Sequence, residues 1–265
     1  MTYNCIDFSK EGPLAVIVMN RPGVCNAISA ELLGELVDAL ERCGEDDSVR
    51  AIILTGAGDR AFCAGGDVKA MKAGLAAGDA GQFLRGIVPG LHEAVMTIRW
   101  LSKPIVAAVN GVAAGGGASI ALSCDLRVAA EKARFTQSFV NIGLSCEGGG
   151  SYFLPRLVGL SKATELLFLG ETIDARQAEA LGLVHKVAPD SEIMSAAREL
   201  ALQLAAKPAA AIAQMKALLN ESFERDLRSQ LEAEGQDILA CVDTADFEEG
   251  VTAFVEKRTA KFGGR

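Results

Sequence analysis

The sequence has few of the residues that build metal centres and disulfide frameworks. Only two of its 265 residues are histidine, and its seven cysteines form no C-x-x-C pair. An odd number of cysteines without that spacing argues against a zinc site and against a disulfide framework. We therefore expect no metal and no cofactor, and we expect a chain that resides in the cytoplasm or another reducing compartment.

Clusters of basic residues are also missing. The chain has 26 Lys and Arg against 34 Asp and Glu, which gives a net charge of −8. Because contacts to phosphates dominate affinity for nucleic acids, this balance argues against broad nucleic-acid binding. A local basic spot for one small anionic ligand is still compatible with it. The first ten residues lack the apolar stretch of a signal peptide.

One stretch without charge imitates a membrane span. Residues 104–124 contain no charged side chain, but they include Asn110 and the run Gly115-Gly116-Gly117. Glycine is a poor helix former in water, although membrane helices tolerate it better. A strand, a glycine turn and a buried helix explain the stretch as well, and we expect this arrangement and no membrane span.

Apolar runs alternate with helical patterns in the first half of the chain. Continuous apolar runs are typical of strands that are buried on both faces. They predict strands at 14–19, 51–55, 104–109 and 125–129. Ser29 is typical of a helix N-cap and precedes a helical pattern over 29–40, and a second helix is expected over 82–101. This interleaving predicts an α/β fold.

The second half changes character. The only clear strand signal after Ser161 lies at 182–187, and helical patterns follow at 190–206, 209–222, 224–241 and 243–258. No linker rich in Ser, Pro or Gly separates the two halves. We expect one unit with an α/β core over 1–200 and a helical C-terminal extension over 201–265.

Two glycine-rich turns are the first functional signal. Residues 55–61 imitate a dinucleotide fingerprint, but the chain is expected to keep turning through 62–66, so no helix begins where a pyrophosphate needs one. The turn at 62–68 and the turn at 110–117 each precede a predicted helix. Free backbone N–H groups at such turns can hold an oxyanion, whereas tight packing of helix on strand is the commoner use of such glycines.

Four motifs in order give the chain a specific resemblance. It resembles the enoyl-CoA hydratase/isomerase (crotonase) superfamily from end to end, through these segments: N-R-P-G-V-C-N-A at 20–27, A-F-C-A-G-G-D at 61–67, K-P-I-V-A-A-V-N-G at 103–111 followed by the glycine run, and F-V-E-K-R at 254–258. One such motif is weak evidence. Four motifs with the family's order and spacing are strong evidence.

The resemblance implies a fold, a substrate and a binding site. The fold would be a spiral of ββα units with a C-terminal helical region for oligomerisation, in trimers or hexamers. The substrate would be an acyl-CoA thioester. The backbone N–H groups of Ala64 and Gly116 would form an oxyanion hole for the thioester enolate. The residues that would contact the substrate are Val24, Ala64, Gly65, Gly66, Asp67, Val68, Gly116, Phe139 and Lys257 of a neighbouring subunit.

The catalytic carboxylates separate the reactions of this superfamily. Typical hydratases carry two glutamates, and their positions are occupied here by Ser119 and Phe139. Water addition needs a carboxylate to activate water and a group to protonate carbon, and neither side chain can do this near neutral pH. The sequence therefore argues against classical hydration.

One glutamate remains in the right region. Glu147 lies in I-G-L-S-C-E-G, which resembles the L-G-x-x-x-E-G of Δ3,Δ2-enoyl-CoA isomerases of the peroxisomal type. Ring-modifying isomerases of phenylacetate-type pathways carry an aspartate there. A single base suffices for a double-bond shift, so the resemblance predicts an isomerase with Glu147 as acid–base. The alternative for Glu147 is a solvated carboxylate in a turn.

Two other functions are kept open. His92 stands twelve residues before Pro104, as a histidine does in the related 4-chlorobenzoyl-CoA dehalogenase, so a hydrolase or dehalogenase acting on an aromatic acyl-CoA is one alternative. A lone histidine on a helix is more often structural, and His185 is expected to be structural too. The other alternative is a non-catalytic acyl-CoA-binding protein.

Overall fold

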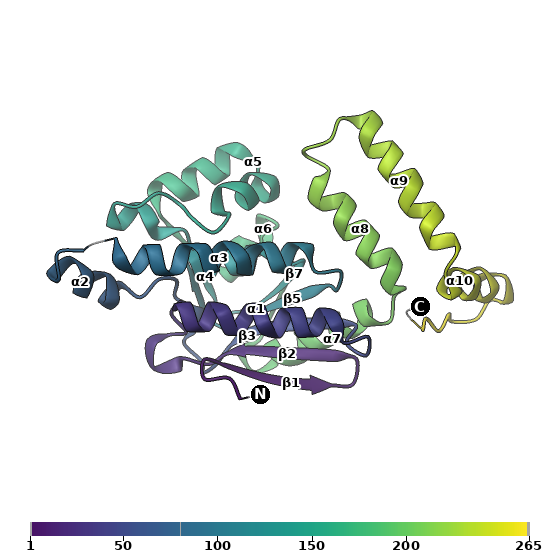
Figure 1. Cartoon of the computed structure of the whole chain (residues 1–265), viewed down its shortest axis with the longest axis horizontal. Helices are drawn as coiled ribbons and strands as arrows, with labels where there is room; N and C mark the ends of the chain where they lie inside the picture. Colours follow the sequence, from purple (N-terminus) through teal and green to yellow (C-terminus); the bar gives the residue numbers. More distant parts are fainter. Residues whose placement is uncertain (1, 80, 264–265) are drawn as a thin grey trace.

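The strands form two sheets that lie next to each other. The computed structural model describes residues 2–79 and 81–263. The larger sheet has the order β1-β2-β3-β5-β7-β10 and the smaller one the order β4-β6-β8-β9. Figure 1 labels β1, β2, β3, β5 and β7 of the larger sheet. The strands are β1 (Ile6–Glu11), β2 (Leu14–Met19), β3 (Ala51–Gly56), β4 (Ala61–Cys63), β5 (Ile105–Val109), β6 (Val112–Ala114), β7 (Leu126–Ala130), β8 (Arg134–Thr136), β9 (Thr172–Asp174) and β10 (Lys186–Ala188).

Helices cover the sheets and dominate the C-terminal part. They are α1 (Ala30–Glu45), α2 (Val68–Ala76), α3 (Gln82–Trp100), α4 (Gly116–Ser123), α5 (Gly150–Leu169), α6 (Ala175–Ala180), α7 (Ile193–Ala205), α8 (Ala209–Glu221), α9 (Leu227–Val242) and α10 (Ala245–Glu256). Short 3-10 helices lie at η1 (Pro22–Val24), η2 (Ser138–Ile142) and η3 (Asp190–Glu192).

The chain repeats one pattern of two strands and a helix. Three consecutive pairs, β3 with β4, β5 with β6, and β7 with β8, place their first strand in the large sheet and their second strand in the small one. A helix follows each pair. Neighbouring pairs join in parallel in both sheets. This arrangement confirms the predicted spiral of ββα units, and it brings the loops that follow β4, β6 and β8 to one region.

The apolar strands are continuous because both faces of the large sheet are covered. Ile52 and Leu54 of β3 face the core that contains α1 and α3, whereas Ala51 and Ile53 face the core that contains α7. Side chains alternate between the faces of a strand, so a strand covered on both sides needs apolar residues throughout. The helix α1 begins after Ser29, whose hydroxyl accepts a hydrogen bond from the Leu32 amide, as predicted.

Most predicted elements are confirmed, and two details were wrong. The late strand covers only Lys186–Ala188, so His185 precedes it. The segment expected to keep turning after residue 61 begins instead with β4. The small sheet was not predicted, because its strands have three residues each and show no alternation that a sequence pattern can reveal.

The uncharged stretch 104–124 divides as predicted. It contains β5, β6 and α4, with the glycine run between β6 and the body of α4. Across the described part of the chain, we find no helix with both the length and the apolar character that a membrane crossing requires.

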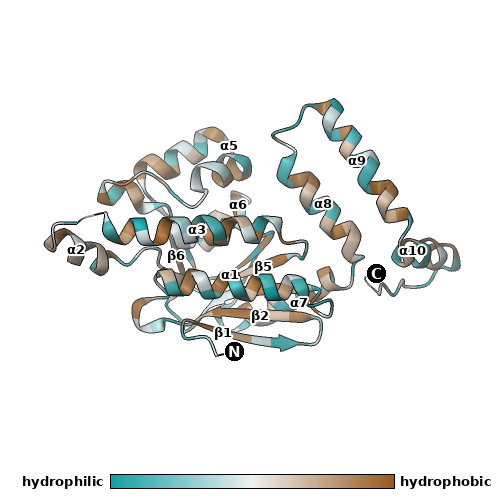
Figure 2. Ribbon diagram, viewed as in Figure 1, coloured by the Kyte–Doolittle hydropathy of each residue, from teal (hydrophilic) through white to brown (hydrophobic). Residues whose placement is uncertain are grey.

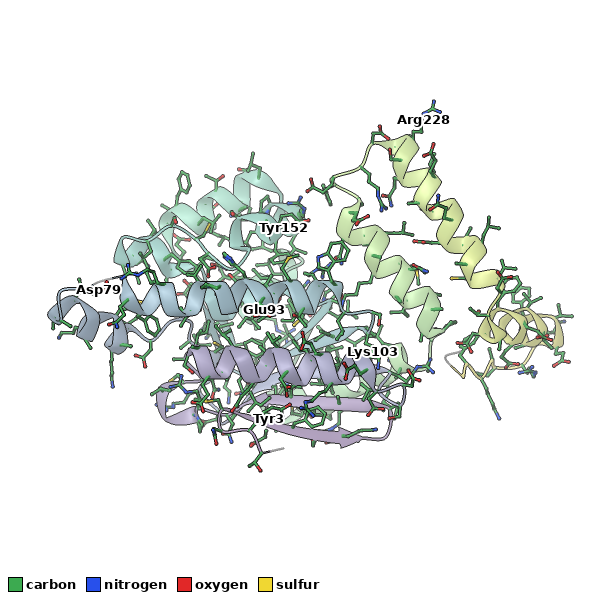
Figure 3. The ribbon with its side chains drawn as sticks, viewed as in Figure 1. Tyr3, Asp79, Glu93, Lys103, Tyr152 and Arg228 are labelled. Atoms are coloured by element: carbon green, nitrogen blue, oxygen red, sulfur yellow. The ribbon has the colours of Figure 1, made fainter. Side chains whose placement is uncertain are left out.

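The last helices project from the core. Figure 1 shows α8 and α9 side by side, away from the sheets, with α10 at the far end. Their surfaces carry hydrophobic residues among polar ones (Figure 2), and Leu227, Ile238 and Phe254 are among those exposed. Tyr152 of α5 points toward α8 (Figure 3), where its hydroxyl donates to the Asn220 carbonyl at 3.4 Å. The predicted boundary after residue 200 falls inside α7, and the expected extension ends at 264–265, outside the described residues.

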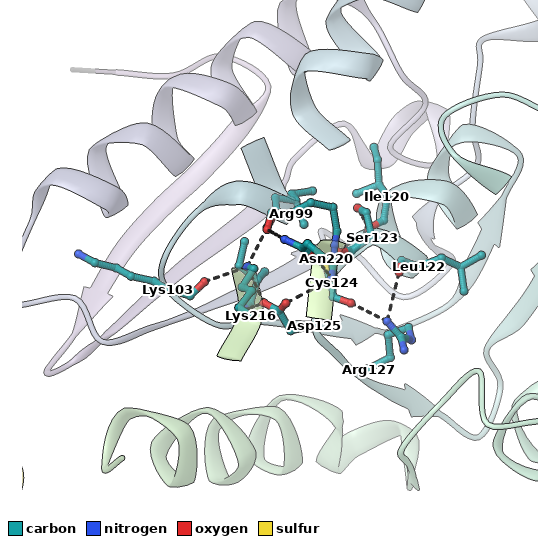
Figure 4. A network of polar contacts seen from close by, with 12 residues as sticks. Arg99, Lys103, Ile120, Leu122, Ser123, Cys124, Asp125, Arg127, Lys216 and Asn220 are labelled. Carbon is teal, nitrogen blue, oxygen red and sulfur yellow. Dashed lines mark hydrogen bonds and ion pairs between the residues drawn. The ribbon is translucent and has the colours of Figure 1, made fainter. Parts of the chain in front are cut away.

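A buried lysine attaches α8 to the core. The Nζ atom of Lys216 donates to the Asp125 carboxylate at 2.8 Å and to the carbonyls of Ile98 and Lys103 at 2.8 and 3.2 Å (Figure 4). Only 7% of Lys216 is exposed. Burial lowers the pKa of Lys216, and the Asp125 carboxylate opposes this shift. Arg99 pairs with the same carboxylate at 3.4 Å.

We expect Lys216→Met to loosen this attachment. The variant removes the buried ammonium group from the Asp125 carboxylate and from two carbonyls, so the free energy of unfolding should fall by about 3 kcal/mol. Urea denaturation followed by circular dichroism measures this change. Lys162→Met is the control, because it breaks an exposed pair with Glu165 and should change stability by less than about 0.5 kcal/mol. Equal stabilities of the two variants would contradict the assigned role of Lys216.

Candidate active site

An apolar cavity of about 210 Å³ lies where the loops after β4, β6 and β8 meet α3. Its walls come from segments far apart in the sequence. The lining residues are Ile28, Ala64, Gly65, Gly66, Val68, Met71, Leu84, Ile87, Val88, Leu91, Gly115, Gly116, Ser138, Phe139, Ile142, Leu144, Ser145 and Glu147. Glu147 is the only charged residue among them, so the cavity suits an uncharged hydrocarbon group next to one carboxylate.

The two glycine turns reach each other at this cavity. A Cβ atom placed on Gly65 would lie 2.5 Å from the Ala114 carbonyl oxygen and 3.4 Å from the Gly116 nitrogen. Gly116 is the first residue of α4, so its N–H has no acceptor within the helix and lies at the positive end of the helix dipole. The turns therefore place the Ala64 and Gly116 amides in one region.

The two amides differ in their present partners. The Ala64 N–H donates to the Cys25 carbonyl at 3.0 Å. A substrate oxygen that binds there must share that donor or displace the carbonyl, because one N–H serves two acceptors only as a three-centre bond. Gly116 is the donor that the helix geometry leaves available.

A buried asparagine holds the loop that carries Cys25. Asn26 is fully buried and adopts positive φ, as does Cys25. Its amide accepts from the Arg21 N–H at 2.9 Å and donates to the carbonyls of Ala57 and Ala61 at 3.0 and 2.8 Å. This asparagine belongs to the N-terminal motif, but the sequence did not reveal its role, because the two carbonyls that it binds lie more than thirty residues away.

Glu147 meets His92 at the edge of the cavity. The Nε2 atom of His92 lies 2.7 Å from Oε1 of Glu147, and 23% of the Glu147 side chain is exposed. No hydrogen bond to the shielded Oε1 atom is found among the described residues, although the His92 nitrogen lies this close to it. A buried carboxylate oxygen without a donor is unusual, and it is able to take a proton from a bound molecule.

Most of the predicted site residues meet here. Ala64, Gly65, Gly66, Val68, Gly116, Phe139 and Glu147 all line the cavity. Val24, Asp67 and Lys257 do not line it. The Asp67 carboxylate caps α2 by accepting from the amides of Lys69 and Ala70. Lys257 directly follows α10. Figure 1 shows α10 far from α2 and α3, which help to line the cavity.

Other reactive side chains near the site are structural. Burial raises the pKa of the Cys63 thiol to about 12, so this thiol stays protonated at neutral pH. His185 accepts from the Arg127 amide through Nδ1, as expected of a structural histidine. Within residues 2–79 and 81–263, no three His, Cys, Asp or Glu side chains lie close enough together to hold a metal ion.

Comparisons with known proteins agree with this geometry. The family model described as enoyl-CoA hydratase/isomerase matches residues 9–265. The chain belongs to the enoyl-CoA hydratase/isomerase family. It is 38% identical to a crotonyl-CoA hydratase of Syntrophomonas wolfei over 99% of both chains. It is 34% identical to a 1,2-epoxyphenylacetyl-CoA isomerase of Escherichia coli, over 96% of this chain and 97% of that protein.

The fold is that of solved structures of the family. The crystal structure of an enoyl-CoA hydratase from Polaromonas matches with a TM-score of 0.92 and 36% identity, over 97% of this chain and 99% of that one. The protein is therefore an enzyme of the enoyl-CoA hydratase/isomerase family, and the family implies an acyl-CoA substrate. Its relatives include both hydratases and an isomerase, so family membership leaves the reaction to be argued from the site.

The two positions that the resemblance assigns to the hydratase glutamates have different environments in the structure. Phe139 lines the cavity, whereas Ser119 is fully buried and does not. The Ser119 hydroxyl donates to the backbone carbonyl of Glu147 at 2.8 Å. Neither residue offers a second carboxylate to the cavity.

Proposed function

We propose that this enzyme shifts a double bond in an acyl-CoA, from a 3-enoyl to a 2-enoyl thioester, with Glu147 as the acid–base. One observation carries the proposal. A single carboxylate faces an otherwise uncharged cavity beside the Gly116 amide, and both hydratase glutamates are replaced. Hydration needs two such groups, whereas proton transfer between two carbons of one substrate needs one.

The chemistry follows from this arrangement. Glu147 takes a proton from C2, and the electron pair of that C–H bond delocalises into the thioester carbonyl as a dienolate. The amides of Gly116 and Ala64 stabilise the oxygen that becomes negative. The protonated Glu147 then returns the proton to C4, the double bond lies between C2 and C3, and no atom is gained or lost. In the neighbourhood of the cavity, Val24 and the turn over 64–68 contact the CoA part of the substrate.

A panel of thioesters tests this function. We expect the enzyme to convert a 3-enoyl-CoA to the conjugated 2-enoyl-CoA. Ultraviolet absorbance and mass spectrometry measure this conversion. A 2-enoyl-CoA in water should give little 3-hydroxyacyl-CoA. Hydration as the main activity would overturn the proposal. Tight binding of every thioester without turnover would instead indicate a non-catalytic acyl-CoA-binding protein.

A second function is favoured by the contact between Glu147 and His92. A carboxylate and an imidazole 2.7 Å apart can act as nucleophile and base in hydrolysis or dehalogenation of an aromatic acyl-CoA. The His92 side chain is 59% exposed, however, and it lines a different cavity, between α3, α5 and α8. These observations fit a peripheral histidine better than a catalytic one.

His92→Gln separates the two functions. If Glu147 works alone, the variant should isomerise a 3-enoyl-CoA at a rate within about threefold of the wild type, because the change removes no group from the cavity. The second function would be supported if the wild type releases free CoA or halide from an aromatic acyl-CoA and the variant does not. A shifted double bond in an aromatic substrate would point to a ring-modifying isomerase.

The assembly is also part of the proposal. We propose a homotrimer or a hexamer in which the C-terminal helices pack against neighbouring subunits and Lys257 reaches a neighbour's substrate. The exposed apolar side chains of α8, α9 and α10 support this, because a hydrophobic surface of that kind is costly in a monomer. Light scattering of the purified protein measures the mass of the assembly.

A further inference from the structure

Ser119 occupies the position of a catalytic glutamate but performs a different task. It is fully buried in α4 and does not line the cavity. Its hydroxyl donates to the backbone carbonyl of Glu147 at 2.8 Å, across 28 positions of the sequence. The other donor to that carbonyl is the Gly150 amide, at 3.5 Å. Ser119 is therefore the closer attachment of the Glu147 backbone.

A second buried side chain orients this serine. The Gln137 amide nitrogen lies 3.4 Å from the Ser119 hydroxyl oxygen and donates to it, and only 5% of Gln137 is exposed. The hydroxyl can then give its own proton to the Glu147 carbonyl. Gln137 also precedes η2, which carries the cavity residues Ser138 and Phe139. One chain of hydrogen bonds thus joins η2, α4 and the loop of Glu147.

The glycine after Glu147 permits the Glu147 loop to lie close to Ser119 of α4. Gly148 has a φ of +67°, and a Cβ atom added there would lie 3.0 Å from the Ser119 Cβ atom. A larger residue would strain the backbone and push the loop away from α4. The loop of Glu147 is therefore shaped to rest on Ser119.

We propose that Ser119 and Gln137 are positioning residues that hold the Glu147 carboxylate at the reacting carbons. The inference rests on the proposed role of Glu147. The position that supplies a carboxylate in typical hydratases here supplies a tether for the carboxylate that remains. A small displacement of a catalytic group costs much of its rate, so losing the tether should slow proton transfer and leave substrate binding unchanged.

The test compares two serines of the same helix. Ser119→Ala and Ser123→Ala remove the same atom from fully buried positions of α4, but Ser123 donates only to the Ile120 carbonyl within the helix. The assay incubates a 3-enoyl-CoA with each enzyme in D2O. Mass spectrometry follows the double-bond shift and the deuterium uptake, at C2 of the remaining 3-enoyl-CoA and at C4 of the product. Titration calorimetry with a saturated acyl-CoA measures binding.

We expect Ser119→Ala to lower kcat and the exchange rate about tenfold while Kd for the saturated acyl-CoA stays within about twofold. Ser123→Ala should keep both values. Gln137→Met should lower kcat in the same direction, and combining it with Ser119→Ala should add little, because both act through one hydrogen-bonded chain.

Two results would overturn the inference. One is a Ser119→Ala enzyme that exchanges and isomerises like Ser123→Ala, and the other is a loss of binding in proportion to the loss of kcat. Glu147→Gln in the same assay separates this failure from failure of the proposed function. If Glu147→Gln retains exchange, Glu147 is not the base. If it loses exchange while Ser119→Ala is unaffected, only the tether is wrong.

Discussion

Replacing Glu147 by Gln should reduce isomerisation of a 3-enoyl-CoA by about 1,000-fold in kcat. The amide keeps the shape of the side chain but cannot accept the proton from C2. Among the residues that the structure describes, no other carboxylate lines the cavity to replace it. The Gly116 and Ala64 amides are untouched, so affinity for a saturated acyl-CoA should change by less than about threefold. Ultraviolet absorbance of the conjugated product measures kcat, and calorimetry measures affinity.

The control for this prediction is a glutamate on the surface. Glu93 follows His92 on α3, is exposed, and does not line the cavity. Glu93→Gln therefore makes the same substitution at a distance from the proposed active site. It should retain the wild-type rate. A Glu147→Gln enzyme with more than about a third of wild-type turnover would show that the proton is carried by another group.

Replacing Gly117 by Ala should damage the fold more than any other change proposed for this protein. A Cβ atom at Gly117 would lie 2.2 Å from the Cys63 carbonyl oxygen and 2.7 Å from its carbon. Neither atom can move without shifting β4, because both belong to the backbone. We expect the free energy of unfolding to fall by about 4 kcal/mol or more, or no folded protein to be recovered. Urea denaturation measures the change.

The same contact governs the site. It sets the distance between α4 and β4, and these two elements carry Gly116 and lead into Ala64. Any Gly117→Ala protein that folds should therefore bind an acyl-CoA poorly. Gly34→Ala is the matched control on an exposed face of α1, where a Cβ atom meets nothing within 4 Å. It should stabilise the protein by about 0.5–1 kcal/mol. A Gly117→Ala protein as stable as the wild type would refute the packing argument.

Local patterns were sufficient for the elements that bury a face. Burial dictates a pattern within each of these elements. The five-residue and six-residue strands β2, β3 and β5 are apolar throughout, and the helix after Ser29 has one apolar face. The small sheet has no such signal, since a strand of three residues such as β4 is shorter than any pattern that distinguishes it from a turn. Its existence depends on partners that the chain brings together from distant segments.

The residue types that are available for catalysis can be read directly from the sequence. It places Glu147 before a glycine, replaces both hydratase glutamates by Ser119 and Phe139, and supplies the four motifs of the family. The residue at each motif position is known without the fold, so the resemblance to the family predicted a single acid–base before any contact was known.

Tertiary structure alone decided what those groups touch. The hydrogen bond from Ser119 to the Glu147 carbonyl, the use of the Ala64 amide by Cys25, and the contact of His92 with Glu147 join residues separated by 28 to 55 positions. A hydrogen bond depends on a few tenths of an ångström, and no spacing along a chain determines such distances. The packing of α4 against the loop of Glu147 sets the first of these three contacts.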